Sequence, residues 1–230
     1  MNLNFLPAAV IFDMDGVLID SNPFHVRKWE TLLTEHGIPF DRASLPKQVL
    51  GPRNGPSLRH FFGAGLTAEL QRRLSEELEV RFRRDFGPHA KPFPGVRRLI
   101  AECQAKGTPM ALASSAMSKN VNFIVDALNL RASFQVILSG DEVTRAKPYP
   151  EIYVKAAAKL GLQPPDCVAI EDSFVGIEAA KSAGMKCVGV ASTFPARDLQ
   201  AETRADLVIP TLEALDLQAL QELFRRAGDL

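Results

Sequence analysis

Short apolar runs alternate with amphipathic segments along most of this chain. Each run is bounded by turn residues, and this combination predicts buried strands at residues 10–12, 110–113, 134–138, 167–170, 186–190 and 207–209. Apolar residues at helical spacing predict helices at residues 96–106, 121–130, 151–160, 174–183 and 212–226. Strands and helices that alternate in this way form a parallel sheet covered on both faces. The sequence therefore predicts an α/β fold with a doubly wound parallel sheet.

One long block interrupts this alternation after the first strand. It shows helical patterns and no convincing strand: Ser21-Asn22-Pro23 predicts a helix start, and Gly37 predicts its end. Further helices are expected at residues 58–62 and 66–86, beside a loop rich in Gly and Pro at residues 50–56. We therefore expect residues 1–20 and 91–230 to form one core domain and residues 21–90 to form an inserted helical domain.

The charge balance and the cysteines narrow the classes of function. The 230 residues contain 27 Lys and Arg and 27 Asp and Glu, so no net basic field would attract nucleic acid or a membrane surface. No apolar run approaches the roughly 18 residues that a membrane helix needs. Cys103, Cys167 and Cys187 lack zinc-ligand spacing and fit a reducing compartment. Because the first residues carry no basic segment, we expect no signal peptide and a cytoplasmic location, and the absence of a heptad pattern favours a monomer.

Two carboxylates follow the first predicted strand. Side chains at positions i and i+2 of an extended chain point the same way, so Asp13 and Asp15 can face one pocket. Carboxylates so close repel each other unless a cation or a shared proton intervenes, and a hard cation such as Mg²⁺ prefers oxygen ligands. The alternative is an ordinary polar exit from a strand, since Asp and Gly are common turn residues.

Other polar residues stand where further strands end. Ser114 follows the second strand, Glu171 and Asp172 follow another, and Lys147 lies in the loop Arg145-Ala146-Lys147-Pro148. Taken singly, the serine could be a helix cap, the lysine a solvated loop residue, and the two acids a favourable start for the next helix. Their coincidence at the carboxyl ends of strands, where parallel sheets bind ligands, favours a site instead.

The residue types in this set suit phosphoryl transfer. A carboxylate can attack the phosphorus, a second carboxyl can protonate the leaving oxygen and then activate water, and cations can offset the charge of a dianion.

Four short stretches of the chain together resemble the motifs of one protein family. Four stretches, in this order and spacing, resemble the haloacid dehalogenase-like superfamily: Asp13-Met14-Asp15-Gly16-Val17, Leu112-Ala113-Ser114-Ser115, Lys147-Pro148 and Ile170-Glu171-Asp172-Ser173. The helical insert resembles the α-helical cap of the subgroup that contains β-phosphoglucomutase and phosphoglycolate-type phosphatases. The resemblance implies a Rossmann-like catalytic core with this cap.

The resemblance also implies roles for individual residues. Asp13 would be the nucleophile, Asp15 the general acid and base, and Ser114 and Lys147 the ligands of the transferring phosphoryl group, with Asn120 near it. Mg²⁺ would be held by Asp13, by the backbone carbonyl of Asp15 and by Asp172, with Glu171 in or next to its coordination shell. The presence of Asp15 speaks against a dehalogenase, whose chemistry needs no acid at that position.

Two cap residues are candidates for contact with the site or the substrate. Residues 22–29 resemble the start of the cap in β-phosphoglucomutase, so His25 is expected to touch Asp15 or its linker; the alternative is an exposed helix histidine. Gly51-Pro52-Arg53 resembles the specificity loop of the cap, and Arg53 could bind a second phosphate or a carboxylate, or be a solvated loop residue.

Departures from the mutase pattern decide between the remaining functions. Arg53 comes two residues after the loop glycine instead of three, and the lysine of a mutase cap is replaced around residues 78–82 by apolar or acidic residues. We therefore expect a Mg²⁺-dependent phosphatase that acts on a small phosphorylated metabolite, such as a sugar phosphate, through an aspartyl-phosphate. The alternatives are a β-phosphoglucomutase-like mutase, a phosphonatase that uses Lys47, and a non-catalytic phospho-acceptor or binding protein.

Overall fold

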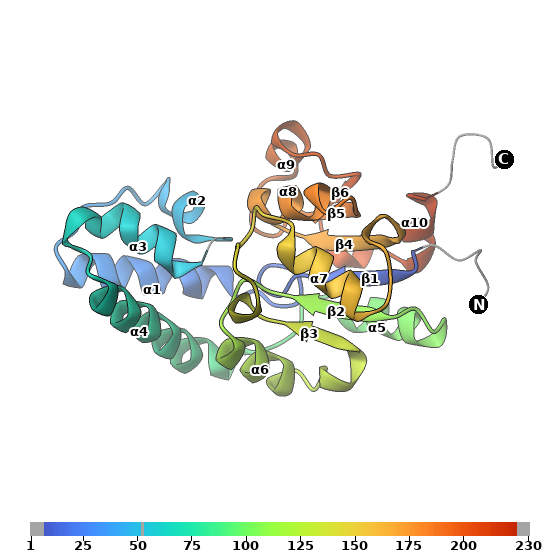
Figure 1. Ribbon diagram of the computed structural model, residues 1–230, viewed down its shortest axis with the longest axis horizontal. Coiled ribbons are helices and arrows are strands. Elements are labelled where there is room, and N and C mark those ends of the chain that lie inside the picture. Colours follow the sequence, from blue (N-terminus) through green and yellow to red (C-terminus); the bar gives the residue numbers. More distant parts are fainter. Residues whose placement is uncertain (1–6, 52, 225–230) are drawn as a thin grey trace.

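The chain forms an α/β core with a group of helices at one end (Figure 1). The computed structural model describes residues 7–51 and 53–224. None of the helices in those ranges is both long and apolar enough to cross a lipid bilayer.

Six parallel strands form one sheet in the order β3-β2-β1-β4-β5-β6. Their bounds are Ala9–Phe12 (β1), Met110–Ala113 (β2), Val136–Leu138 (β3), Cys167–Glu171 (β4), Lys186–Val190 (β5) and Leu207–Ile209 (β6). The chain builds outward from β1 to β3 on one side and from β4 to β6 on the other. The order thus reverses between β1 and β4, and ligands bind at such a switch point in open parallel sheets.

Helices cover both faces of the sheet, which explains why its strands are apolar without alternation. On one face lie α5 (Val96–Ala105), α6 (Ser118–Ala127) and α10 (Leu217–Glu222), and on the other lie α7 (Glu151–Lys159), α8 (Phe174–Ser182) and α9 (Ala196–Glu202). The second face is rich in alanine on both the strands and the helices, so α7 and α8 can pack close to the sheet. The predicted fold class is confirmed.

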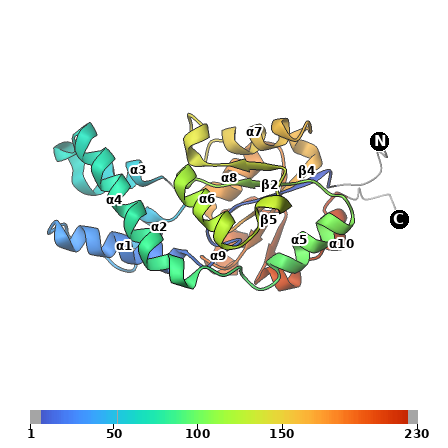
Figure 2. The same cartoon turned by 90° about the horizontal axis from the view of Figure 1, so that it is seen from below.

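Four helices between β1 and α5 form a separate group, which we call the cap. They are α1 (Asn22–Glu35), α2 (Leu45–Val49), α3 (Asn54–Phe62) and α4 (Ala68–Phe86). Trp29 of α1, Leu58 of α3 and Leu78 of α4 belong to a hydrophobic cluster distinct from those on the two faces of the sheet. Seen from below, the cap still extends from one end of the core (Figure 2).

The two segments that join cap and core lie side by side. Ile19, in the segment after β1, forms an antiparallel bridge with Pro92, in the segment after α4. The backbone N–H of Phe93 donates to the carbonyl of Leu18 at 2.8 Å. The cap therefore leaves and rejoins the core at a single place.

Short 3-10 turns complete the structure. They are η1 (Gly63–Gly65), η2 (Gly87–His89), η3 (Arg131–Ser133), η4 (Gly140–Glu142), η5 (Pro164–Asp166) and η6 (Leu212–Ala214).

The structure corrects several predicted boundaries. The helix expected at residues 212–226 is present only in part. Residues 212–214 form η6, and α10 begins at Leu217, because the Asp216 side chain caps it by accepting the N–H of Ala219 at 2.7 Å. Residues 225 and 226 lie outside the described residues. Residues 54–56, expected in a loop, already belong to α3, and the short helices α2 and α9 were not expected at all.

Candidate active site

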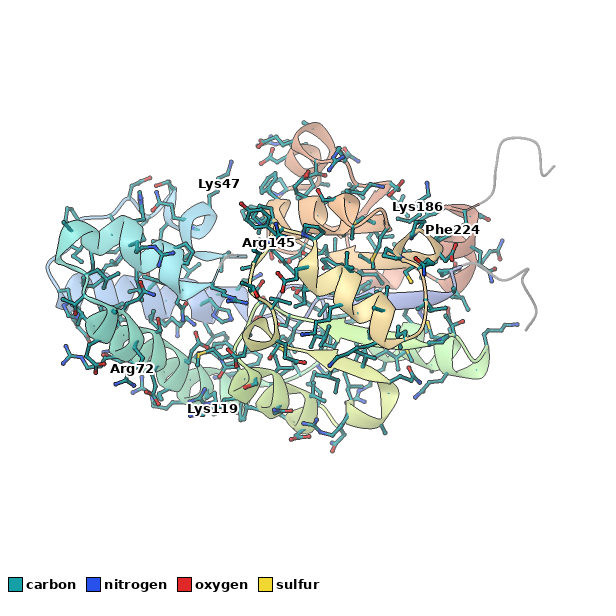
Figure 3. All side chains as sticks on the ribbon, in the orientation of Figure 1. Lys47, Arg72, Lys119, Arg145, Lys186 and Phe224 are labelled. Atoms are coloured by element: carbon teal, nitrogen blue, oxygen red, sulfur yellow. The ribbon has the colours of Figure 1, made fainter. Side chains whose placement is uncertain are left out.

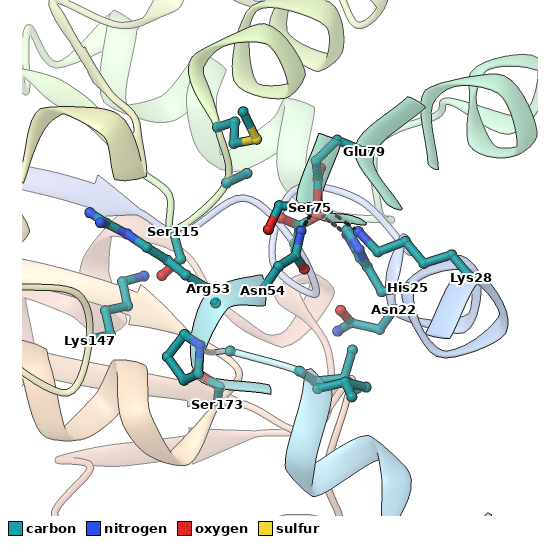
Figure 4. Close-up of a pocket in the computed structure, with 18 of the residues that line it drawn as sticks. Asn22, His25, Lys28, Arg53, Asn54, Ser75, Glu79, Ser115, Lys147 and Ser173 are labelled. Carbon is teal, nitrogen blue, oxygen red and sulfur yellow. Dashed lines mark hydrogen bonds and ion pairs between the residues drawn. The ribbon is translucent and has the colours of Figure 1, made fainter. Parts of the chain in front are cut away.

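A cavity of about 400 Å³ lies where the cap meets the carboxyl ends of the strands (Figure 4). The core contributes Asp13, Asp15, Lys147 and Asp172 to its wall, and cap helices contribute a further set of polar residues, namely Asn22, His25, Lys28, Asn54, Ser75 and Glu79. The cavity is therefore polar on both its core side and its cap side.

A buried lysine joins two carboxylates at the switch point of the sheet. Lys147 Nζ donates to Asp13 Oδ1 at 2.7 Å, to Glu171 Oε1 at 2.6 Å and to the carbonyl of Ala113 at 3.1 Å. The lysine side chain is only 3 % exposed. Burial alone would lower its pKa, but the charges of Asp13 and Glu171 raise the pKa above the usual value, so the ammonium is charged.

Glu171 is fully buried, and protein donors surround its carboxylate. Oε1 accepts the hydroxyl of Tyr153 at 2.7 Å as well as Lys147, and Oε2 accepts the N–H groups of Asp172 and Ser173. These contacts hold Lys147 in place against the sheet. Sequence reasoning missed Tyr153, because an aromatic residue on the apolar face of a helix has the signature of an ordinary core residue.

Three carboxylates are grouped closely enough to hold a metal ion. Ligand atoms of Asp13, Glu171 and Asp172 lie within 4.8 Å of one another, and all three residues are buried. Burial, the largest cause, raises the pKa of Asp13 to about 7, and burial together with the charges of Glu171 and Asp13 raises the pKa of Asp172 well above its usual value. A divalent cation would relieve this repulsion, so the donor set fits Mg²⁺.

Gly16 shapes the backbone beside this group. Its φ is +79°, a left-handed conformation, and a Cβ at this position would overlap Asp172 Oδ2. Only a glycine lets the loop after β1 pass so close to that carboxylate.

Asp15 lies in the same cavity but outside the metal-sized group. Its Oδ1 accepts the hydroxyl of Ser21 at 2.5 Å and lies 3.1 Å from His25 Nε2. Although burial alone would raise it, the pKa of Asp15 is lowered by the charge and hydrogen bond of His25 and by the hydroxyl of Ser21. The imidazole stacks on Phe82, with 4.2 Å between ring centroids. His25 thus touches Asp15 as the resemblance implies.

The cap also contacts Asp172. The amide of Asn22, the first residue of α1, donates to Asp172 Oδ2 at 3.1 Å and to Thr193 Oγ1 at 2.5 Å, and the hydroxyl of Thr193 donates to the same carboxylate oxygen. Neither Asn22 nor Thr193 was selected from the sequence, because each is an ordinary helix-start or loop residue by type.

Two predicted phosphate ligands, Ser114 and Asn120, are buried and are not among the residues that line the cavity. Ser114 is 1 % exposed and its hydroxyl accepts the N–H of Ala116 at 3.1 Å, whereas its neighbour Ser115 lines the cavity. Asn120 is fully buried and does not line the cavity. Its amide donates to Glu79 and accepts from Arg83, so it binds α6 to the cap helix α4 instead of facing the phosphate site.

Arg53 lines the cavity, but its guanidinium reaches the core. Nη2 donates to the carbonyls of Gly140 and Val143, the latter at 2.7 Å, and Nε is buried without a hydrogen-bond partner among the described residues. The arginine therefore links the cap loop to η4.

Lys47 is exposed on α2, projects outward (Figure 3) and lies over the ring of Phe174 at 5.6 Å. It does not line the cavity, so its placement argues against a phosphonatase.

Comparisons with known proteins agree with this fold. Residues 7–184 match the family model of haloacid dehalogenase-like hydrolases. The chain is 34 % identical over 222 residues to the β-phosphoglucomutase of Bacillus subtilis, covering 93 % of this chain and 94 % of that protein. It is 31 % identical over 229 residues to hexitol phosphatase B of Escherichia coli, covering 92 % and 96 %. The crystal structure of a β-phosphoglucomutase from Clostridium difficile matches with a TM-score of 0.84 and 27 % identity, over 94 % of this chain and 96 % of that one.

Proposed function

The chain belongs to the haloacid dehalogenase-like hydrolases, and we propose that within this family it is a Mg²⁺-dependent phosphatase of a small phosphorylated metabolite, such as a sugar phosphate. The observation that carries the proposal is the contact between Lys147 and Asp13 at the switch point of the sheet, with Asp15 in the same cavity. A nucleophile, a cation and a second carboxyl are what phosphoryl transfer requires.

Asp13 is the proposed nucleophile. Lys147 donates a hydrogen bond to Oδ1 of Asp13 and so orients this carboxylate. The ammonium of Lys147 also offsets the charge of an approaching phosphoryl group. In the first step, an Asp13 oxygen forms a bond to phosphorus as the bond from phosphorus to the ester oxygen breaks. The product is an aspartyl-phosphate and a leaving alcohol.

Asp15 is the proposed acid and base. The negative charge of a bound phosphate ester favours the protonated form of Asp15, so Asp15 can give a proton to the leaving oxygen. In the second step Asp15 takes a proton from water, the water oxygen bonds to phosphorus, and the bond to Asp13 breaks to release inorganic phosphate. The contacts from Ser21 and His25 fix the direction in which the carboxyl points.

Asp13, Asp172 and the backbone carbonyl of Asp15 are the proposed Mg²⁺ ligands, with Glu171 beside them. Bound there, the ion would offset the charge shared by the carboxylates and the phosphate. Glu171 already accepts hydrogen bonds at both oxygens, which favours a role in positioning Lys147.

A phosphatase is favoured over a mutase by the cap. A mutase must bind a bisphosphate in two orientations, so its cap needs a cation for the second phosphate. Here Arg53 donates to core carbonyls, and the acidic Glu79 lines the cap side of the cavity.

The test is phosphate release from a panel of phosphomonoesters with Mg²⁺, with Asp13→Asn in parallel. The panel includes β-glucose 1-phosphate with and without its 1,6-bisphosphate. Steady release that EDTA or the substitution abolishes is the expected result. Conversion to glucose 6-phosphate with little free phosphate would make the protein a mutase, and inactivity of the wild type on every ester would contradict both.

A further inference from the structure

Asn22, the first residue of the cap helix α1, reaches a carboxylate of the core. Its Nδ2 donates to Asp172 Oδ2 at 3.1 Å and to Thr193 Oγ1 at 2.5 Å. Asp172 directly follows β4 and Thr193 lies in the loop after β5, so one amide joins the start of the cap to two loops of the core. Figure 4 shows the Asn22 side chain in the wall of the cavity.

The polar side chains at the start of α1 bind the core instead of the helix. Ser21 occupies the N-cap position, where a serine side chain usually accepts an N–H of the first turn, but it makes no such hydrogen bond. Its hydroxyl donates to Asp15, and the next residue, Asn22, donates to Asp172. Two adjacent residues at the start of the cap therefore each bind one acid of the proposed site.

One oxygen of Asp172 is held by protein donors. Oδ2 accepts the amide of Asn22 and the hydroxyl of Thr193, and it lies so close to the backbone of Gly16 that a Cβ there would overlap it. Among the described residues, no donor forms a hydrogen bond to Oδ1. The contacts to Oδ2 thus fix the rotation of the carboxylate and leave Oδ1 available for a cation.

The orientation of Asp172 matters because this residue belongs to the group of three carboxylates whose ligand atoms lie within 4.8 Å of one another. Residues that hydrogen-bond to a metal-ligating side chain orient it, and their loss typically weakens metal binding by about 10- to 100-fold. Asn22 has the position of such a residue, and it belongs to the cap, whereas all three carboxylates belong to the core.

We propose that Asn22 is a positioning residue that orients Asp172 for a divalent cation and so couples binding of that cation to the position of the cap. The proposal rests on the Mg²⁺ site of the proposed function. When the cap moves away, the amide of Asn22 leaves with α1, and Asp172 keeps only the hydroxyl of Thr193. Because such coupling is reciprocal, a cation bound at Asp172 in turn favours the cap position in which Asn22 makes its contact.

The first experiment titrates the metal-free protein with Mg²⁺ in a calorimeter, so its readout is affinity and not activity. Asn22→Ala removes the amide and should raise the Kd for Mg²⁺ by roughly tenfold. Asn122→Ala is the matched control, because Asn122 lies exposed on α6 and accepts a hydrogen bond from Arg131 at 2.9 Å, away from the cavity. Its Kd should equal that of the wild type.

The second experiment measures the reciprocal effect by limited proteolysis of the segments that join cap and core. Cleavage of a locally opened segment follows the population of the open form when opening and closing are fast. Saturating Mg²⁺ should therefore slow cleavage of the wild type by about the same factor, roughly tenfold. In Asn22→Ala, Mg²⁺ at a concentration that saturates the variant should protect these segments much less.

Each measurement can overturn the proposal. A folded Asn22→Ala with the Mg²⁺ affinity of the wild type would do so, as would a wild type that binds no Mg²⁺. A wild type whose cleavage rate ignores saturating Mg²⁺ would do so even if Asn22→Ala did not fold. The proposed function is judged separately by phosphate release: if the wild type releases phosphate only with Mg²⁺ while Asn22→Ala binds Mg²⁺ normally, the function stands and this proposal fails.

Discussion

His25 Nε2 lies 3.1 Å from Asp15 Oδ1, and this contact joins the first helix of the cap to the loop that follows β1. The same imidazole stacks on Phe82 of α4, so one side chain connects Asp15 to two cap helices. The orientation of the proposed acid therefore depends on where the cap lies.

Replacement of His25 tests that dependence. In His25→Ala, Asp15 keeps only the hydroxyl of Ser21, and a misplaced acid should lower kcat by roughly 10- to 100-fold. Steady-state kinetics on the best ester of the panel gives the measurement. His36→Ala, at the exposed end of the same helix, should behave like the wild type. A kcat unchanged in His25→Ala would show that Asp15 does not need the imidazole.

Replacement of Lys147 tests the buried ion pairs. Lys147→Met leaves Asp13 and Glu171 without their cation, and loss of one partner in a buried pair typically costs about 3–5 kcal/mol. The melting temperature should fall by roughly 6–20 °C, and Mg²⁺ should restore more stability to the variant than to the wild type. Lys159→Met breaks only an exposed pair and should lose at most about 1 kcal/mol. Similar melting temperatures for both variants would contradict this account.

Replacement of Gly16 tests whether the close approach of its backbone to Asp172 matters for metal binding. An added methyl in Gly16→Ala overlaps Asp172 Oδ2, so the carboxylate must move and the stabilisation by Mg²⁺ in a thermal-melting experiment should be reduced or lost. Gly37→Ala is the control, because its φ of +63° imposes a similar backbone cost of about 1–2 kcal/mol while its methyl would lie in open space. If both variants keep the full response to Mg²⁺, Asp172 is not a ligand.

Arg53 is expected to hold the cap against the core. Arg53→Met removes the hydrogen bonds to Gly140 and Val143, so the cap should open more often. Faster proteolysis of the segments that join cap and core would report this opening, as would a larger radius of gyration in solution scattering. Arg73→Met, on the exposed face of α4, provides the comparison. Identical cleavage rates in the two variants would exclude a holding role.

Glu79 should also make stability depend on pH. Its pKa in the folded chain lies below the ordinary value of 4.5, so its contribution is complete above about pH 4.5 and disappears as the pH falls through the lower folded value. The difference in unfolding free energy between the wild type and Glu79→Gln should therefore be largest near neutral pH and shrink in acid. Urea unfolding at a series of pH values measures it. A difference that grows in acid would reverse the assigned direction of the shift.

The sequence predicted those parts of the site that follow from strand ends. Asp13 and Glu171 come together because β1 and β4 are neighbours in a parallel sheet, and Lys147 reaches them from the loop that follows β3 at the same edge. A polar residue directly after an apolar run has a position that the fold class largely determines.

Contacts between cap and core could not be predicted in the same way. Asn120 was expected near the phosphate, yet it binds Glu79 and Arg83, because its surroundings depend on how α4 lies against α6. The reach of Arg53 to Gly140 likewise depends on the orientation of two separately packed units. No periodicity in the sequence encodes that orientation. The five-residue helix α2 is too short to produce a helical pattern.

The bridge between Ile19 and Pro92 has a consequence for how proteins of this architecture can change. Because the insert enters and leaves at one place, a contiguous stretch of the gene can be exchanged for another without altering strand order in the core. A graft made at these two residues transfers a complete wall of the cavity and leaves the acids at the strand ends on the core. It also exchanges Ser21 and His25, so each new insert has to supply its own contacts to Asp15.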